Sequence, residues 1–152
     1  LKPNTVVQYW ARAENAVMGL NQGAKVLMSP AKYAYLDMKY DTASVFGLNW
    51  AAYIEVDDAY NWDPAMLVPE ITRENITGIE APLWTETVST FREAEWLIYP
   101  RLAGYAEIGW TPAEMRSWDE YRLRLAEHGK RMEVMDIGFY RSPLVDWEEV
   151  TE

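Results

Sequence analysis

The chain has 152 residues with no Cys and one His, and 24 acidic residues against 14 Lys and Arg give a formal net charge of −10. This acidity argues against nucleic-acid and anionic-membrane partners, because both require clustered positive charge. The lack of Cys excludes disulfides and thiolate metal sites. No apolar run approaches the roughly 20 residues of a membrane span.

The aromatic composition is skewed toward 8 Trp and 10 Tyr, against 3 Phe. Trp and Tyr combine a flat apolar face with a hydrogen-bonding edge. This combination suits sugars, which present flat C–H faces and a rim of hydroxyls. Composition alone fits a Trp-rich core equally well, so both interpretations stay open at this point.

The first part of the chain alternates strand and helix. Residues 5–10 are β-branched and aromatic and predict a buried strand. Residues 12–22 have helical spacing and end before Gly23, which suits a helix C-terminus. Residues 24–28 predict a second strand, and residues 31–49 have no sustained period, so we expect a long loop there that could include a turn of helix.

The middle of the chain contains a third strand and a broken helix. We expect a short helix over residues 50–56 and a strand over residues 78–84, although Pro82 is unusual inside a strand. Residues 91–108 have a helical pattern with Pro100 inside it, which predicts a kink or break near that residue.

The last part of the chain reads as helix followed by a packed tail. Thr-Pro at residues 111–112 has the order of an N-cap and first helical residue. Ser117 and Glu120 have the spacing of a capping box, which predicts a longer helix to about Met135. Residues 139–152 are expected to pack as a tail through their aromatic and apolar side chains.

Alternating strands and helices predict an α/β fold with a parallel sheet. Three parallel strands would leave both sheet edges uncovered, and a closed eight-stranded barrel needs roughly 250 residues. We therefore expect either that the chain is a piece of a larger unit or that self-association covers its edges.

Aromatic and acidic side chains follow all three predicted strands. They are Trp10, Tyr35, Asp37, Trp50, Trp84 and Glu86. Ligands of parallel α/β folds bind at the carboxyl ends of the strands. No Lys or Arg belongs to this group, which disfavours phosphate and carboxylate ligands, and no metal or cofactor is predicted. Aromatic planes beside carboxylates that accept hydrogen bonds from hydroxyls predict a site for a neutral sugar.

Several runs resemble glycoside hydrolase family 20, the β-N-acetylhexosaminidases: VVQYW (6–10), KVLMSP (25–30), YLDMKY (35–40), GIEAPLWTE (78–86), YPRLA (99–103) and AEIGW (106–110). The resemblance extends from about Val6 to Trp147. It implies a (β/α)8 TIM barrel, to which residues 1–152 would contribute about the last three βα units as a partial catalytic domain. It is similar to the bacterial secreted-type branch, which implies an extracellular or periplasmic location.

The resemblance also implies a mechanism in which the substrate's 2-acetamido oxygen attacks the anomeric carbon, an exception to the two-carboxylate scheme. The general acid of the family is a Glu that directly follows an Asp. The one Asp-Glu pair of this sequence is Asp119-Glu120, within the predicted capping box and after the last strand. We therefore expect the catalytic pair to lie upstream, and this chain alone to be inactive.

The resemblance assigns a role to each candidate residue. Trp10 and Trp50 match two walls of an aromatic cage around the acetamido methyl group, and Tyr35 matches the hydroxyl that hydrogen-bonds the acetamido oxygen. The remaining three match contacts to the terminal sugar ring, namely a platform under the pyranose for Trp84 and acceptors for the O4 and O6 hydroxyls for Asp37 and Glu86.

Two alternatives remain open from the sequence. A non-catalytic carbohydrate-binding domain would use the same aromatic excess without chemistry. A different glycosidase would use Asp37 and Glu86 as its carboxylate pair, about 5–5.5 Å or 6.5–9.5 Å apart. The five other tryptophans are assigned to packing: Trp62, Trp96, Trp110, Trp118 and Trp147.

Overall fold

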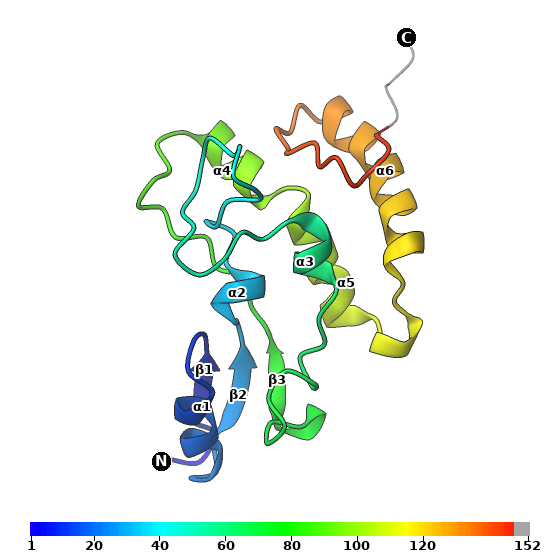
Figure 1. Cartoon of the computed structure of the whole chain (residues 1–152). Helices are drawn as coiled ribbons and strands as arrows, with labels where there is room; N and C mark the ends of the chain where they lie inside the picture. The colour runs from blue at the N-terminus through cyan, green and yellow to red at the C-terminus, as the bar shows by residue number, and fades with distance from the viewer. Residues whose placement is uncertain (148–152) are drawn as a thin grey trace.

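The computed structural model describes residues 1–147, in which three strands form one parallel sheet. Its order is β1 (Val6–Tyr9), β2 (Lys25–Met28) and β3 (Ile76–Ile79), so strands adjacent in the chain are adjacent in the sheet. All three carboxyl ends therefore lie at the same edge, from which α2 (Ala31–Ala34) continues (Figure 1). The first two strands match their predicted ranges closely.

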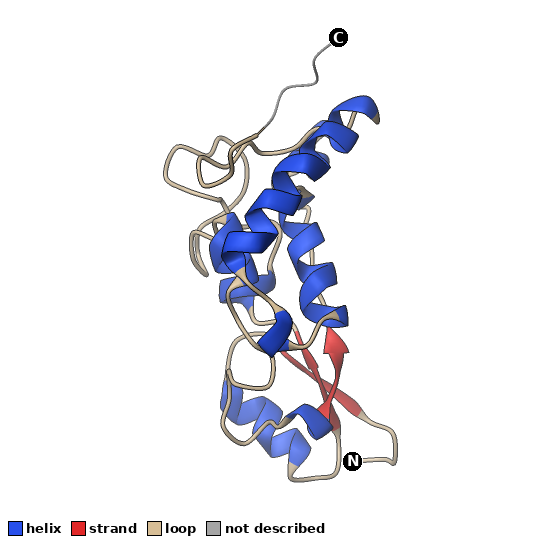
Figure 2. Cartoon of the chain, turned by 90° about the vertical axis from the view of Figure 1, so that its right-hand side faces the viewer, coloured by secondary structure: helices blue, strands red, loops and turns tan. Residues whose placement is uncertain are grey.

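Helix α1 (Ala13–Leu20) connects β1 to β2 and covers one face of the sheet (Figure 2). It approaches β1 so closely that a Cβ on Gly19 would lie 2.6 Å from the Val7 side chain. Val7 packs in the cluster under α1, whereas Val6 and Gln8 are exposed. Because side chains alternate along a strand, Val6 and Gln8 belong to the opposite face of the sheet, the inner face if these strands form part of a barrel.

The long connection from β2 to β3 contains α3 (Val56–Tyr60) and the 3₁₀ helix η1 (Arg73–Asn75). The predicted helix over residues 50–56 is wrong, because residues 50–55 are not helical and the Ile54 amide donates to the Lys39 carbonyl at 2.8 Å. Helix α3 begins only at Val56, where the Glu55 carboxylate accepts a hydrogen bond from the Val56 amide at 2.6 Å. Acidic side chains favour helix N-termini, so Glu55 is the N-cap and the helix begins after it.

The predicted third strand is displaced toward the N-terminus. Strand β3 ends at Ile79, three residues before Pro82, so the proline lies outside the strand, as its lack of an amide donor favours. The break in the following helix is confirmed, since α4 (Phe91–Ile98) and α5 (Arg101–Trp110) are separated at Pro100.

The C-terminal part of the described chain is largely helical. Residues 111–112 lead only into a short 3₁₀ turn, η2 (Ala113–Met115), and α6 (Trp118–Val134) follows. Ser117 is the N-cap of α6 by position, but its side chain makes no capping hydrogen bond, so the predicted capping box is wrong. The hydroxyl does not accept the amide hydrogen bond that such a box requires. Residues 148–152 of the predicted tail lie outside the described residues.

Three buried clusters hold the molecule together. One lies between α1 and the sheet, one beneath α2 and α5, and one between α3, α6 and the segment after α6. Arg124 of α6 also pairs with Glu107 of α5 at 2.7 Å. No helix within residues 1–147 has the length and apolarity needed to cross a membrane.

Candidate active site

Four aromatic rings meet at the carboxyl edge of the sheet. Trp10 directly follows β1, Tyr35 follows α2, Trp50 comes from the long connection, and Trp84 lies beyond β3. The ring centroids of Trp10 and Trp50 are 6.4 Å apart, those of Tyr35 and Trp50 5.9 Å, and those of Tyr35 and Trp84 6.1 Å. These distances link the rings into one cluster, hereafter the aromatic cluster, as the sequence predicts.

The exposure of three of these rings distinguishes the aromatic cluster from a buried hydrophobic core. Tyr35 is 5% exposed, whereas Trp10, Trp50 and Trp84 are 49%, 56% and 51% exposed. Burial raises the pKa of the Tyr35 hydroxyl, with the Trp84 side chain acting in the opposite direction. The hydroxyl therefore stays protonated at neutral pH and can donate a hydrogen bond. Three half-exposed indoles around a buried phenol leave apolar ring surface available to a ligand.

Asp37 is the buried carboxylate of the site, with only 1% of its surface exposed. Its Oδ1 accepts a hydrogen bond from the Trp84 amide at 3.4 Å, and its Oδ2 has no partner within residues 1–147. Burial raises the pKa of Asp37, nearby Glu86 raises it further, and Arg101 opposes both. A buried oxygen without a donor is costly, so Asp37 is prepared to accept a hydrogen bond from a ligand hydroxyl.

Arg101, which the sequence places in the YPRLA run without a role, fixes the backbone around Asp37. Its guanidinium is fully buried and lies 3.9 Å from the Tyr40 ring centroid. It donates to four backbone carbonyls, those of Leu36 (2.7 Å), Met38 (2.9 Å), Ile54 (3.2 Å) and Leu97 (2.7 Å). Since two of these carbonyls flank Asp37, Arg101 sets the path of the chain on both sides of that carboxylate.

The position of Trp50 depends on a close backbone contact. The Leu48 amide donates to the Asp37 carbonyl at 2.8 Å, and the Lys39 amide donates to the Leu48 carbonyl at 2.7 Å. Gly47 has φ of +95°, and a Cβ there would lie 2.8 Å from the Asp37 carbonyl oxygen. Glycine is the residue that tolerates both conditions, so Gly47 is the sequence signal that marks this contact.

A polar bridge joins the ends of the three strands beside the aromatic cluster. Gln8 donates to the Ser29 hydroxyl at 2.8 Å and to the Glu80 carboxylate at 2.5 Å. Sequence reasoning assigned no role to these residues, because their contact joins segments that are far apart in the chain. The bridge connects β1, the end of β2 and the residue after β3, which stabilises the edge that carries the site.

The tryptophans assigned to packing differ in burial. Trp62 is buried, and Trp96, Trp118 and Trp147 are partly buried. Trp110 is 90% exposed, so its assignment to packing is wrong within the described chain. It ends α5 beside an open groove of about 670 Å³. No group of three or more His, Asp or Glu side chains in the described part of the chain is placed to hold a metal ion.

Comparison with known proteins identifies the family to which this geometry belongs. The model of the glycosyl hydrolase family 20 catalytic domain matches residues 1–113. The chain belongs to glycosyl hydrolase family 20. A β-N-acetylhexosaminidase from Cellulomonas fimi is 44% identical over 150 residues, which cover 97% of this chain and 30% of that protein.

Solved structures of family 20 enzymes give the same result. The β-N-acetylhexosaminidase of Streptomyces coelicolor A3(2) superposes with a TM-score of 0.89 at 42% identity, covering 94% of this chain and 30% of that one. A Streptomyces plicatus β-hexosaminidase mutant in complex with its product, GlcNAc, has a TM-score of 0.89 at 41% identity with the same coverage. These matches confirm the α/β class and the TIM-barrel relationship, and the chain spans about a third of each relative's length.

Proposed function

We propose that the protein containing this chain is a β-N-acetylhexosaminidase that removes terminal N-acetylhexosamine from glycans or chitooligosaccharides. The observation that carries the proposal is the convergence of the rings of Trp10, Tyr35, Trp50 and Trp84, with the buried carboxylate of Asp37 bonded to the Trp84 amide. The product complex of the Streptomyces plicatus relative supports the choice of an N-acetylated sugar. Export from a bacterial cell stays a prediction from sequence resemblance.

In this proposal the chain orients the acetamido group of the substrate. Trp10 and Trp50 enclose its methyl group, and the protonated Tyr35 hydroxyl donates to its oxygen. The acetamido oxygen then bonds to the anomeric carbon while the glycosidic bond breaks and the leaving oxygen takes a proton from a general acid. Holding the nucleophile in one orientation is a proximity effect. Water later attacks the anomeric carbon, which opens the oxazolinium intermediate with retention.

The same site would hold the sugar ring through its face and its hydroxyls. Trp84 offers a half-exposed indole as a platform, and Asp37 Oδ2 offers a buried acceptor for a hydroxyl. Glu86 is exposed, lies near Asp37 and supplies a second acceptor. These assignments give O4 and O6 of the terminal sugar two carboxylate partners.

The general acid is proposed to come from upstream chain. The Asp119-Glu120 pair is exposed in the first turn of α6, and Asp119 lies 3.6 Å from Arg122. Helix α6 follows the last strand, with α4 and α5 between them in the chain, so the pair does not stand at a strand end. The upstream part of the same barrel would also cover the open edges of β1 and β3.

The test uses the full-length protein with 4-nitrophenyl N-acetyl-β-D-glucosaminide and with 4-nitrophenyl β-D-glucoside. We expect hydrolysis of the amide-bearing substrate only, with inhibition by a thiazoline that mimics the oxazolinium ion. Equal hydrolysis of the glucoside, or insensitivity to the thiazoline, would favour Asp37 and Glu86 as a carboxylate pair. Sugar binding without hydrolysis would favour a non-catalytic binding domain.

A further inference from the structure

The segment that follows α6 crosses back over the middle of the chain. We call residues 136–142 the C-terminal strap and residues 41–55, which carry Trp50, the Trp50 loop. The strap lies beyond residues 1–113, the range matched by the family model. Its contacts with the Trp50 loop connect that later segment to the proposed sugar site.

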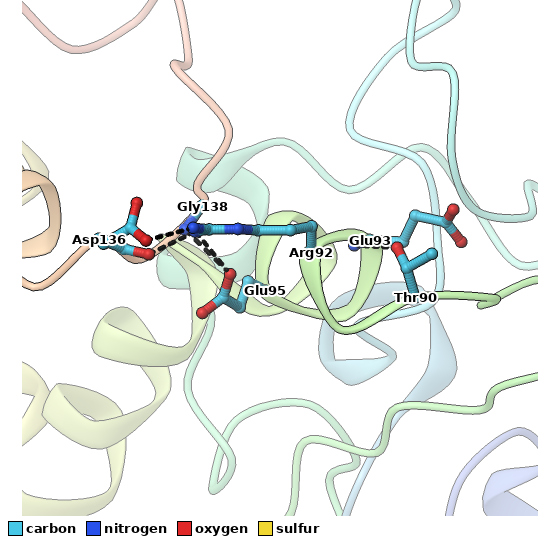
Figure 3. Close-up of polar contacts among 6 residues, drawn as sticks. All are labelled: Thr90, Arg92, Glu93, Glu95, Asp136 and Gly138. Carbon is cyan, nitrogen blue, oxygen red and sulfur yellow. Dashed lines mark hydrogen bonds and ion pairs between the residues drawn. The ribbon is translucent and has the colours of Figure 1, made fainter.

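The start of the strap is fixed to α4 (Figure 3). Arg92 pairs with the Asp136 carboxylate at 2.5 Å and also donates to the Asp136 carbonyl. The Glu95 carboxylate accepts from Arg92 at 3.1 Å and from the Gly138 amide at 3.2 Å. Glu95 is 7% exposed, so a buried carboxylate of α4 holds the strap at Gly138, two residues before Tyr140.

The Tyr140 ring is held between aromatic side chains of the core. It stacks on Tyr40 with centroids 4.0 Å apart and planes 18° from parallel, and it meets the edge of Trp96 at 5.2 Å. The Tyr140 amide donates to the Tyr99 carbonyl at 3.0 Å. The stacked ring and the bonded amide together fix the direction of the Tyr140 hydroxyl.

That direction places the Tyr140 hydroxyl between the two ends of the Trp50 loop. It lies 3.3 Å from Asp41 Oδ2 and 3.3 Å from Glu55 Oε2. The fully buried Ser142 hydroxyl donates to the same Glu55 oxygen at 3.1 Å. Asp41 and Glu55 are the first and last residues of the loop, so one side chain of the strap contacts both.

Each of these carboxylates also organises the backbone beside it. Asp41 Oδ1 accepts from the amides of Ala43 and Ser44 at 3.0 and 2.7 Å. Glu55 Oε1 accepts from the Val56 amide at the start of α3. A shift of either carboxylate would therefore move the backbone at that end of the loop.

We propose that Tyr140 is a positioning residue of the sugar site, because it fixes both ends of the Trp50 loop and so holds Trp50 against Trp10 and Tyr35. The inference rests on the proposed function of that site. The Met38–Leu48 bridge fixes the middle of the loop to the chain around Asp37, and Tyr140 supplies the restraint at its ends. Tyr140 does not touch the substrate and acts through Trp50.

The experiment is a double-mutant cycle in the full-length protein with 4-nitrophenyl N-acetyl-β-D-glucosaminide. We expect Tyr140→Phe to raise KM about fivefold, the effect of losing one hydrogen bond, with a smaller change in kcat. In a Trp50→Ala background the same change should raise KM less than about twofold, because coupled substitutions are not additive, whereas independent sites would keep the full effect. An undiminished effect in that background would overturn the proposal.

The matched control is Tyr121→Phe. Tyr121 also stacks on another tyrosine, Tyr60, with centroids 4.1 Å apart, but its buried hydroxyl has no hydrogen-bond partner within residues 1–147. Its KM should match that of the parent. If Trp50→Ala changes KM and Tyr140→Phe does not, the positioning role is wrong while the proposed function stands.

Hydrogen exchange tests the positioning role independently of activity. Amides of residues 41–55 should exchange faster in Tyr140→Phe than in Tyr121→Phe, because only the first substitution releases the ends of the loop. Equal exchange in the two variants would contradict the role of Tyr140, even in a protein without hexosaminidase activity.

Discussion

The aromatic side chains occupy two regions that use the same residue types differently. In the aromatic cluster, Trp10, Trp50 and Trp84 are each about half exposed. Among the helices, Tyr40 and Tyr60 are each 1% exposed and stack on other tyrosines at 4.0 and 4.1 Å. The composition alone fits a sugar site or an aromatic core, and the structure contains both kinds of cluster. What separates them is whether ring faces are left free.

The largest expected effect falls on the buried region, at Arg101. Arg101→Met would leave the buried carbonyls of Leu36, Met38 and Ile54 without this donor, whereas the Leu97 carbonyl keeps the Tyr40 hydroxyl at 3.2 Å. The change should lower the free energy of unfolding by about 4 kcal/mol or more. Urea unfolding of the full-length protein measures this loss. A change below about 1 kcal/mol would mean that these carbonyls find other donors.

The next effect separates the site carboxylate from a core carboxylate. Asp37→Asn should lower kcat/KM about 30-fold, because hydrogen bonds to charged acceptors are the stronger ones. Glu107→Gln is the matched change among the helices, where Glu107 binds Tyr60 and Arg124, and it should alter stability with little effect on kcat/KM. The distinction between the two regions fails if both substitutions reduce kcat/KM alike.

Two glycines with positive φ allow a smaller and more specific comparison. A Cβ on Gly47 would meet the Asp37 carbonyl oxygen at 2.8 Å, whereas one on Gly23, with φ of +88°, would meet nothing within 4 Å. Gly23→Ala measures the backbone strain alone, about 1 kcal/mol. Gly47→Ala should cost at least about 1 kcal/mol more and should also raise KM. Equal losses of unfolding free energy in Gly23→Ala and Gly47→Ala would show that the contact with the Asp37 carbonyl oxygen has no steric cost.

The smallest effect is a pH dependence at Asp41. Hydrogen bonds, chiefly from Ser44, lower the pKa of Asp41 below its usual value of 3.8, so its charged form stabilises the fold above that value. This contribution is lost as pH falls through the lowered pKa. Asp41→Asn should therefore be less stable than the parent near pH 7, by less than about 1 kcal/mol, and the difference should shrink toward pH 3. If the difference in thermal stability between Asp41→Asn and the parent were the same at pH 7 and pH 3, the charge of Asp41 would not be the source of the stabilisation.

Local patterns predicted the elements that depend on local rules. The first two strands, α1 and the break at Pro100 follow from hydrophobic periodicity and proline geometry. The helix expected at residues 50–56 is absent because tertiary contacts dominate there. Leu48, just before this segment, is bridged to Met38, and the Ile54 amide donates to the Lys39 carbonyl at 2.8 Å instead of to a helical partner.

The sequence predicted which aromatic residues form the candidate site, but not the residues that hold them in place. The order of strands brought Trp10, Tyr35 and Trp84 to one edge, because parallel strands end together. Arg101 belongs to a run that carries the family resemblance, but its role was not predicted, since an arginine near a helix start ordinarily predicts a solvated side chain. Its full burial depends on carbonyls as far away as Leu36, which periodicity cannot reveal. The role of Tyr140 was also missed, because it depends on contacts with residues distant in the chain.

The most direct test of the sugar site is turnover by the full-length protein carrying Tyr35→Phe. The ring and its contacts with Trp50 and Trp84 are kept, and only the hydroxyl proposed to orient the acetamido oxygen is lost. The account predicts that kcat for an N-acetyl-β-glucosaminide falls by about 100-fold or more, with unfolding unchanged. An active Tyr35→Phe protein with the parent's kcat would contradict the role given to the aromatic cluster.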